Sequence, residues 1–151
     1  FKACVGETEM ATGVTIGQQT HKMFGFSYRT KIINDTNGMD HGFKIHLVYN
    51  ALAGVTSRDH TTMNDSPELE EISYDITTTK VPVTGGKPTS HLVIDSTKFT
   101  VATQAKLQAI MDALYGKDAV VGTGTPGAPQ FPAVKAKLLM PDEVMAIINT
   151  P

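Results

Sequence analysis

The chain has 151 residues, of which 40% are hydrophobic and 19% are charged, and its formal net charge at pH 7 is −2. These values are typical of one globular domain with an adequate core. The small negative charge gives no general reason to expect binding to nucleic acid or to an anionic membrane surface. No apolar run reaches the roughly 18 residues of a membrane-spanning helix, and the first residues lack a signal-peptide pattern.

The N-terminal part of the chain carries weak signals. The chain begins with Phe1 rather than methionine, so we expect further residues upstream. Cys4 is the single cysteine and cannot form a disulfide within the chain, so we expect a small buried side chain at this position. Residues 5–12 are mixed and turn-prone, and residues 14–17 are a short strand candidate that ends at its glycine.

Two long strands are predicted next. Residues 23–33 alternate in hydropathy, which predicts a strand whose inner face carries Phe24, Phe26, Tyr28 and Ile32. Residues 34–38 are rich in turn formers, and residues 43–52 then repeat the alternation. The second strand is expected to point Phe43, Ile45, Leu47 and Tyr49 inward and Lys44, His46 and Asn50 outward. The two strands together predict an antiparallel pair, followed by a surface connection over residues 54–67.

Residues 71–97 predict a second pair of strands. Their first part alternates, with Ile72, Tyr74 and Ile76 expected to face inward. The prolines and glycines at residues 82–88 then predict a turn, because proline lacks an N–H donor and glycine permits positive φ. A second apolar run follows at residues 91–94.

The last third of the chain predicts two helices separated by an arm. Residues 101–115 predict a helix with N-cap Thr100, a terminating Gly116 and an apolar stripe of Leu107, Ile110, Met111 and Leu114. Residues 117–133 are rich in glycine and proline and predict an exposed arm or loop. Residues 134–140 are expected to form a short strand, and Pro141 to start a short helix that continues through residues 144–148.

These elements predict a mainly β protein, an antiparallel β-sandwich or barrel-like fold with one flanking helix and a short C-terminal helix. We expect residues 1–116 to form the core, residues 117–133 an arm, and residues 134–151 a C-terminal part of the same domain.

Phosphate-binding and nucleophile motifs are incomplete in this sequence. Residues 85–87 read Gly-Gly-Lys, but Pro88 stands where a phosphate loop needs a hydroxyl residue, and a strand is expected next, so we predict a plain turn. The Gly-Thr-Gly-Thr run at residues 122–125 has no helix directly behind it. No Gly-x-Ser-x-Gly motif accompanies the serines, histidines and aspartates. We therefore expect no catalytic residues and no cofactor.

Histidines and basic residues suggest two further kinds of site. The histidines near aspartates are His41, His46, His60 and His91, among Asp40, Asp59 and Asp65, but none has the spacing of a helical or paired metal motif. We expect solvated histidines and no metal. A nucleic-acid surface is conceivable where Arg29, Lys31, Lys44 and His46 line one strand face, but few aromatic residues interleave with them and the chain is acidic overall, so a solvated or subunit-facing surface is favoured.

Several segments, in order and over nearly the whole chain, carry a resemblance to a known family. These are residues 13–32, 44–51, 77–85 and 95–98, then Leu-Tyr-Gly at 114–116 and Pro-Asp-Glu-Val at 141–144. In these segments the sequence resembles the major tail tube proteins of tailed bacteriophages. The glycine- and proline-rich stretch 117–133 is longer than is usual in that family.

The resemblance implies a structural virion protein that is not an enzyme. It implies a sandwich fold with a flanking helix, and six copies closing into rings that stack through loops and terminal arms around a channel for DNA. Its partners would be copies of itself and, at the tube ends, other tail proteins, with DNA only in passage and no membrane. Its location would be the phage tail, after synthesis in the host cytoplasm. The alternative is another β-rich virion component, such as a head decoration or head–tail connector protein.

Overall fold

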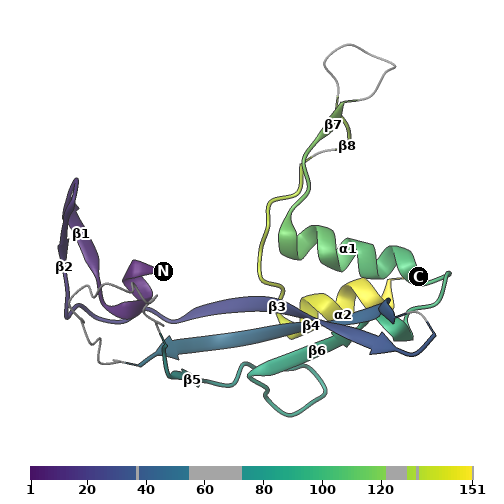
Figure 1. Ribbon diagram of the computed structural model, residues 1–151, viewed down its shortest axis with the longest axis horizontal. Helices are drawn as coiled ribbons and strands as arrows, with labels where there is room; N and C mark the ends of the chain where they lie inside the picture. Colours follow the sequence, from purple (N-terminus) through teal and green to yellow (C-terminus); the bar gives the residue numbers. More distant parts are fainter. Residues whose placement is uncertain (37, 55–72, 122–128, 132, 151) are drawn as a thin grey trace, which may run out of the picture. The chain divides into compact units, whose positions relative to one another are not determined.

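The computed structural model describes residues 1–36, 38–54, 73–121, 129–131 and 133–150 (Figure 1). The chain divides into two compact units. One consists of Phe1–Phe24 with Asn50–Thr79, and the other of Gly25–Tyr49 with Lys80–Pro151. Within the described residues the protein is mainly β, with antiparallel sheets and two α-helices. The predicted surface connection at residues 54–67 falls almost entirely outside the described residues, and so does Ile72.

The first unit contains a 3-10 helix (Lys2–Val5) and a hairpin of β1 (Thr8–Ala11) and β2 (Val14–Ile16). The hairpin pairs antiparallel, with Thr8 opposite Ile16. The strand at β2 was predicted, whereas β1 lies where only turns were expected. In the same unit, β5 (Ile76–Thr78) pairs with the end of β4, where Ala51 and Ala53 are buried.

The second unit is a sheet covered on one face by helices. Its strands are β3 (Phe24–Asn34), β4 (Gly38–Ala53) and β6 (His91–Asp95), with β4 in the middle. Figure 1 shows α1 (Gln104–Tyr115) and α2 (Pro141–Asn149) on the same side of these strands. A 3-10 helix (Ser96–Lys98) joins β6 to the residues before α1, and a ribbon of β7 (Val120–Val121) and β8 (Pro129–Phe131) follows α1.

The core of this unit confirms the predicted alternation of β4. The buried apolar residues on the covered face are Ile45, Leu47 and Tyr49 from β4, Ile94 from β6, Leu107, Ile110 and Leu114 from α1, and Val81, Leu139 and Val144. The intervening β4 residues Lys44 and His46 point to the other face. Because successive strand residues alternate between faces, one side of β4 packs under the helices and the other does not.

The segment 71–97 does not form the predicted pair of strands with each other. Both β5 and β6 pair with β4, at successive positions: Ala51 lies opposite Thr78, and Ile45 lies opposite Ile94. Asn50, where β4 changes partner, has a positive φ of 44°, which asparagine tolerates better than most residues. The prolines and glycines of 82–88 form an excursion closed by paired backbone hydrogen bonds between Val81 and Thr89.

The predicted inner face of residues 23–33 is wrong, because Tyr28 is 44% exposed on the face opposite the helices. Three further predicted details are also wrong. Ile76 was expected to face inward but is 43% exposed. Helix α1 begins at Gln104 instead of residue 101, because the Thr103 hydroxyl accepts the Thr100 N–H at 2.9 Å and holds the preceding residues in turns. Residues 134–140 form no strand beyond a bridge between Val134 and Lys117.

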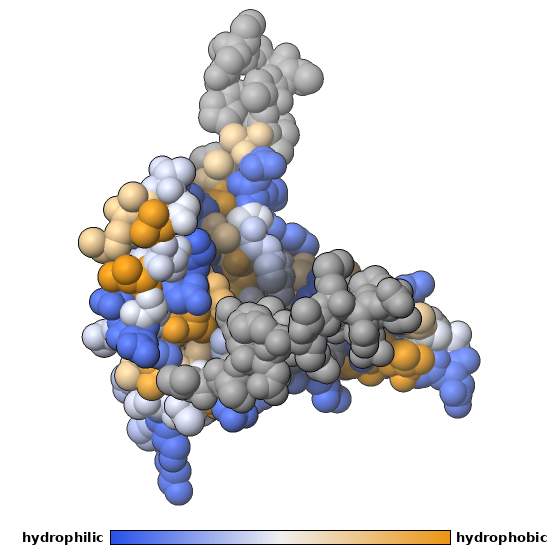
Figure 2. All heavy atoms as spheres, turned by 60° about the vertical axis from the view of Figure 1, so that its left-hand side comes forward, coloured by the Kyte–Doolittle hydropathy of each residue, from blue (hydrophilic) through white to orange (hydrophobic). Residues whose placement is uncertain are grey.

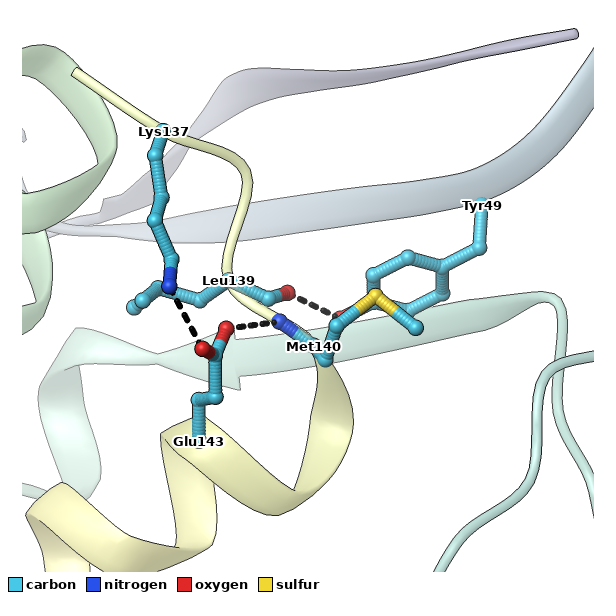
Figure 3. A network of polar contacts seen from close by, with 5 residues as sticks. All are labelled: Tyr49, Lys137, Leu139, Met140 and Glu143. Atoms are coloured by element: carbon cyan, nitrogen blue, oxygen red, sulfur yellow. Dashed lines mark hydrogen bonds and ion pairs between the residues drawn. The ribbon is translucent and has the colours of Figure 1, made fainter.

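The segment before α2 instead joins the sheet to both helices through polar contacts, of which Figure 3 shows those to Tyr49 and Glu143. The Tyr49 hydroxyl donates to the Leu139 carbonyl at 2.9 Å, and the Lys137 N–H donates to the last turn of α1 at the Ala113 carbonyl. The Glu143 carboxylate accepts the Met140 N–H at 2.9 Å and pairs with the Lys137 ammonium. The Lys137 and Met140 N–H groups and the Leu139 carbonyl thus find partners other than a neighbouring strand.

A candidate site on the uncovered face of the sheet

The face of the sheet opposite the helices carries a row of side-chain rings. Pairing between β4 and β6 sets His46 opposite Val93 and Val48 opposite His91, so these four residues share that face. Tyr28 of β3 stacks on His46, which places Tyr28 on the same face. Tyr28 is 44% exposed and Val93 is 45% exposed. The row, which we call the ring row, consists of Phe26, Tyr28, His46 and His91.

The rings of the ring row contact one another in two different ways. Phe26 and Tyr28 are stacked with centroids 6.2 Å apart, and Tyr28 and His46 are nearly parallel at 4.5 Å. His46 and His91 are also nearly parallel, with centroids 5.3 Å apart, but His46 Nδ1 lies 3.1 Å from His91 Nε2. Two coplanar rings whose nitrogens point at each other have centroids separated by the N···N distance plus the radius of each ring. The observed centroid distance of 5.3 Å is close to that sum, so the two imidazoles lie edge to edge in almost one plane.

Hydrogen bonds fix the His46 ring at both nitrogens. Its Nε2 lies 3.0 Å from the Thr30 hydroxyl oxygen, and its Nδ1 faces His91 Nε2. A neutral imidazole has one N–H and one acceptor nitrogen, so one proton lies between the two histidines in either tautomer. Burial of the ring, with the nearby charges of His91 and Lys44, lowers the pKa of His46 below its ordinary value.

The four basic residues grouped in the sequence do not share one face. The Arg29 guanidinium lies over the Phe43 ring, 4.6 Å from its centroid, and Phe43 packs against the core. Arg29 and Lys31 line a hollow of about 310 Å³ together with Met39, Asp40 and Phe43. Lys44 and His46 point to the opposite face of β4. This separation removes the continuous basic stripe that a nucleic-acid surface would need.

The remaining candidates of the sequence lie apart. Residues 85–87 form a turn in which the Gly86 N–H donates to the Val83 carbonyl, and β6 follows with no helix between. His41 contacts Asn34 at 2.9 Å, and Cys4 is half-buried. His60, Asp59, Asp65 and residues 122–125 fall outside the described residues. Among the described residues, no group of three or more histidine, cysteine, aspartate or glutamate side chains could hold a metal ion.

The ring row could not be assembled from sequence spacing. His46 and His91 are 45 positions apart, and only the β4–β6 register brings them together. The sequence offered one signal, because both histidines were expected on or beside solvent-facing sides of strands. That expectation does not say which residue lies next to each histidine.

No described helix is both long and apolar enough to cross a membrane. Comparison with known proteins gives no match to a protein-family model, to a curated protein or to a solved structure.

Proposed function

We propose that this chain is a structural subunit of a bacteriophage tail tube, which assembles with copies of itself into stacked, six-membered rings around a channel that DNA passes through. The proposal rests on the sequence resemblance and on a mainly β architecture. Within it, the sheet is the element that a ring would extend, and the hairpins are the arms that would reach neighbouring copies. The proposal includes the arrangement of the strands as a β-sandwich or a barrel-like fold.

The observation that carries the proposal is the β1–β2 hairpin. All seven of its residues are exposed, and three of them are large apolar residues: Met10, Val14 and Ile16. An isolated two-stranded hairpin is marginally stable at best in water, and exposed apolar side chains gain free energy when another surface covers them. A neighbouring copy would supply that surface.

Exposed apolar residues also occur elsewhere in the described chain. On the face that Figure 2 shows, hydrophobic residues lie at the surface among hydrophilic ones. Further exposed examples are Met23, Ile33, Met39 and Val93. Scattered exposed apolar residues are common in monomers, so these are secondary support, and the fully exposed hairpin is the stronger argument.

Imaging of the purified chain by negative-stain electron microscopy tests the proposal. We expect hollow tubes or six-fold rings. Monomers or trimers that bind only to capsids would overturn it in favour of a head decoration or connector protein. A monomer that hydrolyses an ester or nucleotide, with the activity lost on one substitution, would overturn it in favour of an enzyme.

A matched pair of variants locates the contact. Val14→Asp places a charge on the hairpin, where Val14 is 55% exposed, and should shift rings toward single chains. Val101→Asp makes the same chemical change before α1, where Val101 is 99% exposed, and should leave assembly unchanged. Equal assembly of both variants would show that the hairpin makes no contact between copies.

A further inference from the structure

Two imidazole nitrogens face each other on the uncovered face of the sheet, at a distance that suits two ligands of one ion. His46 Nδ1 and His91 Nε2 are 3.1 Å apart. Zinc binds histidine nitrogen at about 2.0–2.1 Å, and two such nitrogens on a tetrahedral ion lie about 3.3 Å apart. The two nitrogens now point almost directly at each other, so each ring would have to turn in its plane, to about 35° from the N···N line, to aim both lone pairs at one tetrahedral ion.

The geometry points to a binding site for a divalent transition-metal ion, of the kind that imidazole ligands favour, formed by His46 and His91. Imidazole suits Zn²⁺, Cu²⁺ and Ni²⁺ rather than Mg²⁺ or Ca²⁺, which prefer oxygen ligands. The two histidines come from neighbouring antiparallel strands, so the sheet holds their backbones in place before the ion binds. His91 is exposed and His46 is half-buried, so an ion can reach the pair from solvent.

Thr30 and Tyr28 orient the His46 ligand. A metal-binding histidine usually donates its second N–H to a neighbouring oxygen, which fixes the tautomer. The Thr30 hydroxyl, 3.0 Å from His46 Nε2, can accept this N–H and leave Nδ1 unprotonated toward His91. Stacking on Tyr28 at 4.5 Å restricts rotation of the ring out of its plane. Thr30 and Tyr28 are positioning residues for this site.

Protons balance when the ion binds to two neutral histidines. His46 keeps its proton on Nε2, and the proton on His91 moves from Nε2 to Nδ1, so both facing nitrogens offer lone pairs and no net proton is released. The described residues supply two ligands, and water completes the coordination. Such a site is independent of whether the chain assembles into a tube.

The same rings do not favour a platform for stacking nucleic-acid bases. Stacking proteins present free aromatic faces to the bases. Here Tyr28 stacks on both Phe26 and His46, so these three rings already have faces in contact with one another.

Titration of the full chain with Zn²⁺, followed by NMR of the histidine ring resonances, tests the site. We expect the ring signals of His46 and His91 to shift together at one ion per chain, with the His91 ring nitrogens reporting protonation at Nδ1. His41, which contacts only Asn34 among the contacts described for it, should shift little. Unshifted signals of His46 and His91 at saturating Zn²⁺ would overturn the proposal.

Isothermal titration calorimetry of variants gives a second test. All variants carry Cys4→Ser, because a thiolate would compete for zinc. We expect His46→Gln and His91→Gln each to weaken binding by at least about tenfold, and Thr30→Val by up to about tenfold with an altered His46 tautomer in the NMR spectrum. The matched control His41→Gln should bind as the parent does. Equal affinities for His46→Gln, His91→Gln and His41→Gln would contradict the site.

Discussion

At the scale of single residues, Tyr49 shows how a buried polar group couples the sheet to the C-terminal helix. Its ring is almost completely buried in the core, and its hydroxyl donates to the Leu139 carbonyl. Burial, with the nearby Glu143 carboxylate, raises the pKa of Tyr49 to about 12. The neutral phenol is thus the form that the folded protein favours.

Tyr49→Phe should lower the free energy of unfolding by about 1–2 kcal/mol at pH 8, because the Leu139 carbonyl loses its donor. The raised pKa means that the contribution of Tyr49 is fully present below the unfolded pKa near 10 and is lost as the pH rises through about 12. Urea unfolding between pH 8 and pH 12 checks this. The parent should lose more stability than Tyr49→Phe, and parallel losses would contradict the assignment.

Two isoleucines test which face of the strands is buried. Ile45 is 0% exposed in β4, whereas Ile76 in β5 is 43% exposed. Ile45→Asp should prevent folding, since a buried unpaired charge costs several kcal/mol. Ile76→Asp should fold, because its carboxylate stays hydrated. Circular dichroism and urea unfolding of both variants measure the difference. Similar destabilisation of both variants would show that the Ile76 side chain is buried.

At the scale of elements, β4 and α1 could be predicted and the orientation of β3 could not. The apolar residues of β4 and α1 face the core because nothing competes with their periodicity. In β3 the apolar Tyr28 lies on the uncovered face, while Gly25 and Ser27 line a hollow beside α1 and residues 136–138. A Cβ on Gly25 would collide with Leu138. Gly25 leaves room for the Leu138 side chain where the chain crosses closely, and sequence alternation cannot reveal that crossing.

The candidate site was missed for a related reason. His46 was correctly expected to point outward from its strand, but contacts across strands depend on register. The register of β6 against β4 depends on the segment that links β5 to β6, in which the Val81–Thr89 bridge closes the excursion of residues 82–88. Its length fixes which β6 residue meets His46, and no local pattern encodes this.

The β7–β8 ribbon provides a test at this scale. Deleting residues 120–130 should change the free energy of unfolding by less than about 0.5 kcal/mol, because the Lys117–Val134 backbone pair that closes its base lies outside the deletion. If the ribbon contacts neighbouring copies, the deletion should weaken ring or stacking contacts. Thermal unfolding and sedimentation of the deletion are compared with a Gly/Ser replacement of equal length, which keeps the span but not the strand pairing. Unchanged assembly of both variants would show that the ribbon is a passive loop.

At the scale of the whole molecule, the proposal rests on a sheet with one covered face and on the β1–β2 hairpin, whose strand residues are all exposed. Among the described residues β3 lies at one end of its sheet, and a strand in such a position generally presents N–H and C=O groups to which another chain can add. If edge strands of identical copies pair with one another in a ring, those edges are no longer available for uncontrolled aggregation, and the assembly has a defined size. The central claim is therefore that the chain works as a repeating subunit.

The molar mass of the purified chain in solution, measured by light scattering and sedimentation over a wide concentration range, tests this claim most directly. The account predicts particles whose mass is a multiple of six 16.2 kDa chains, and their loss in Val14→Asp but not in Val101→Asp. A single species of one chain at every concentration, with a stable fold, would contradict it.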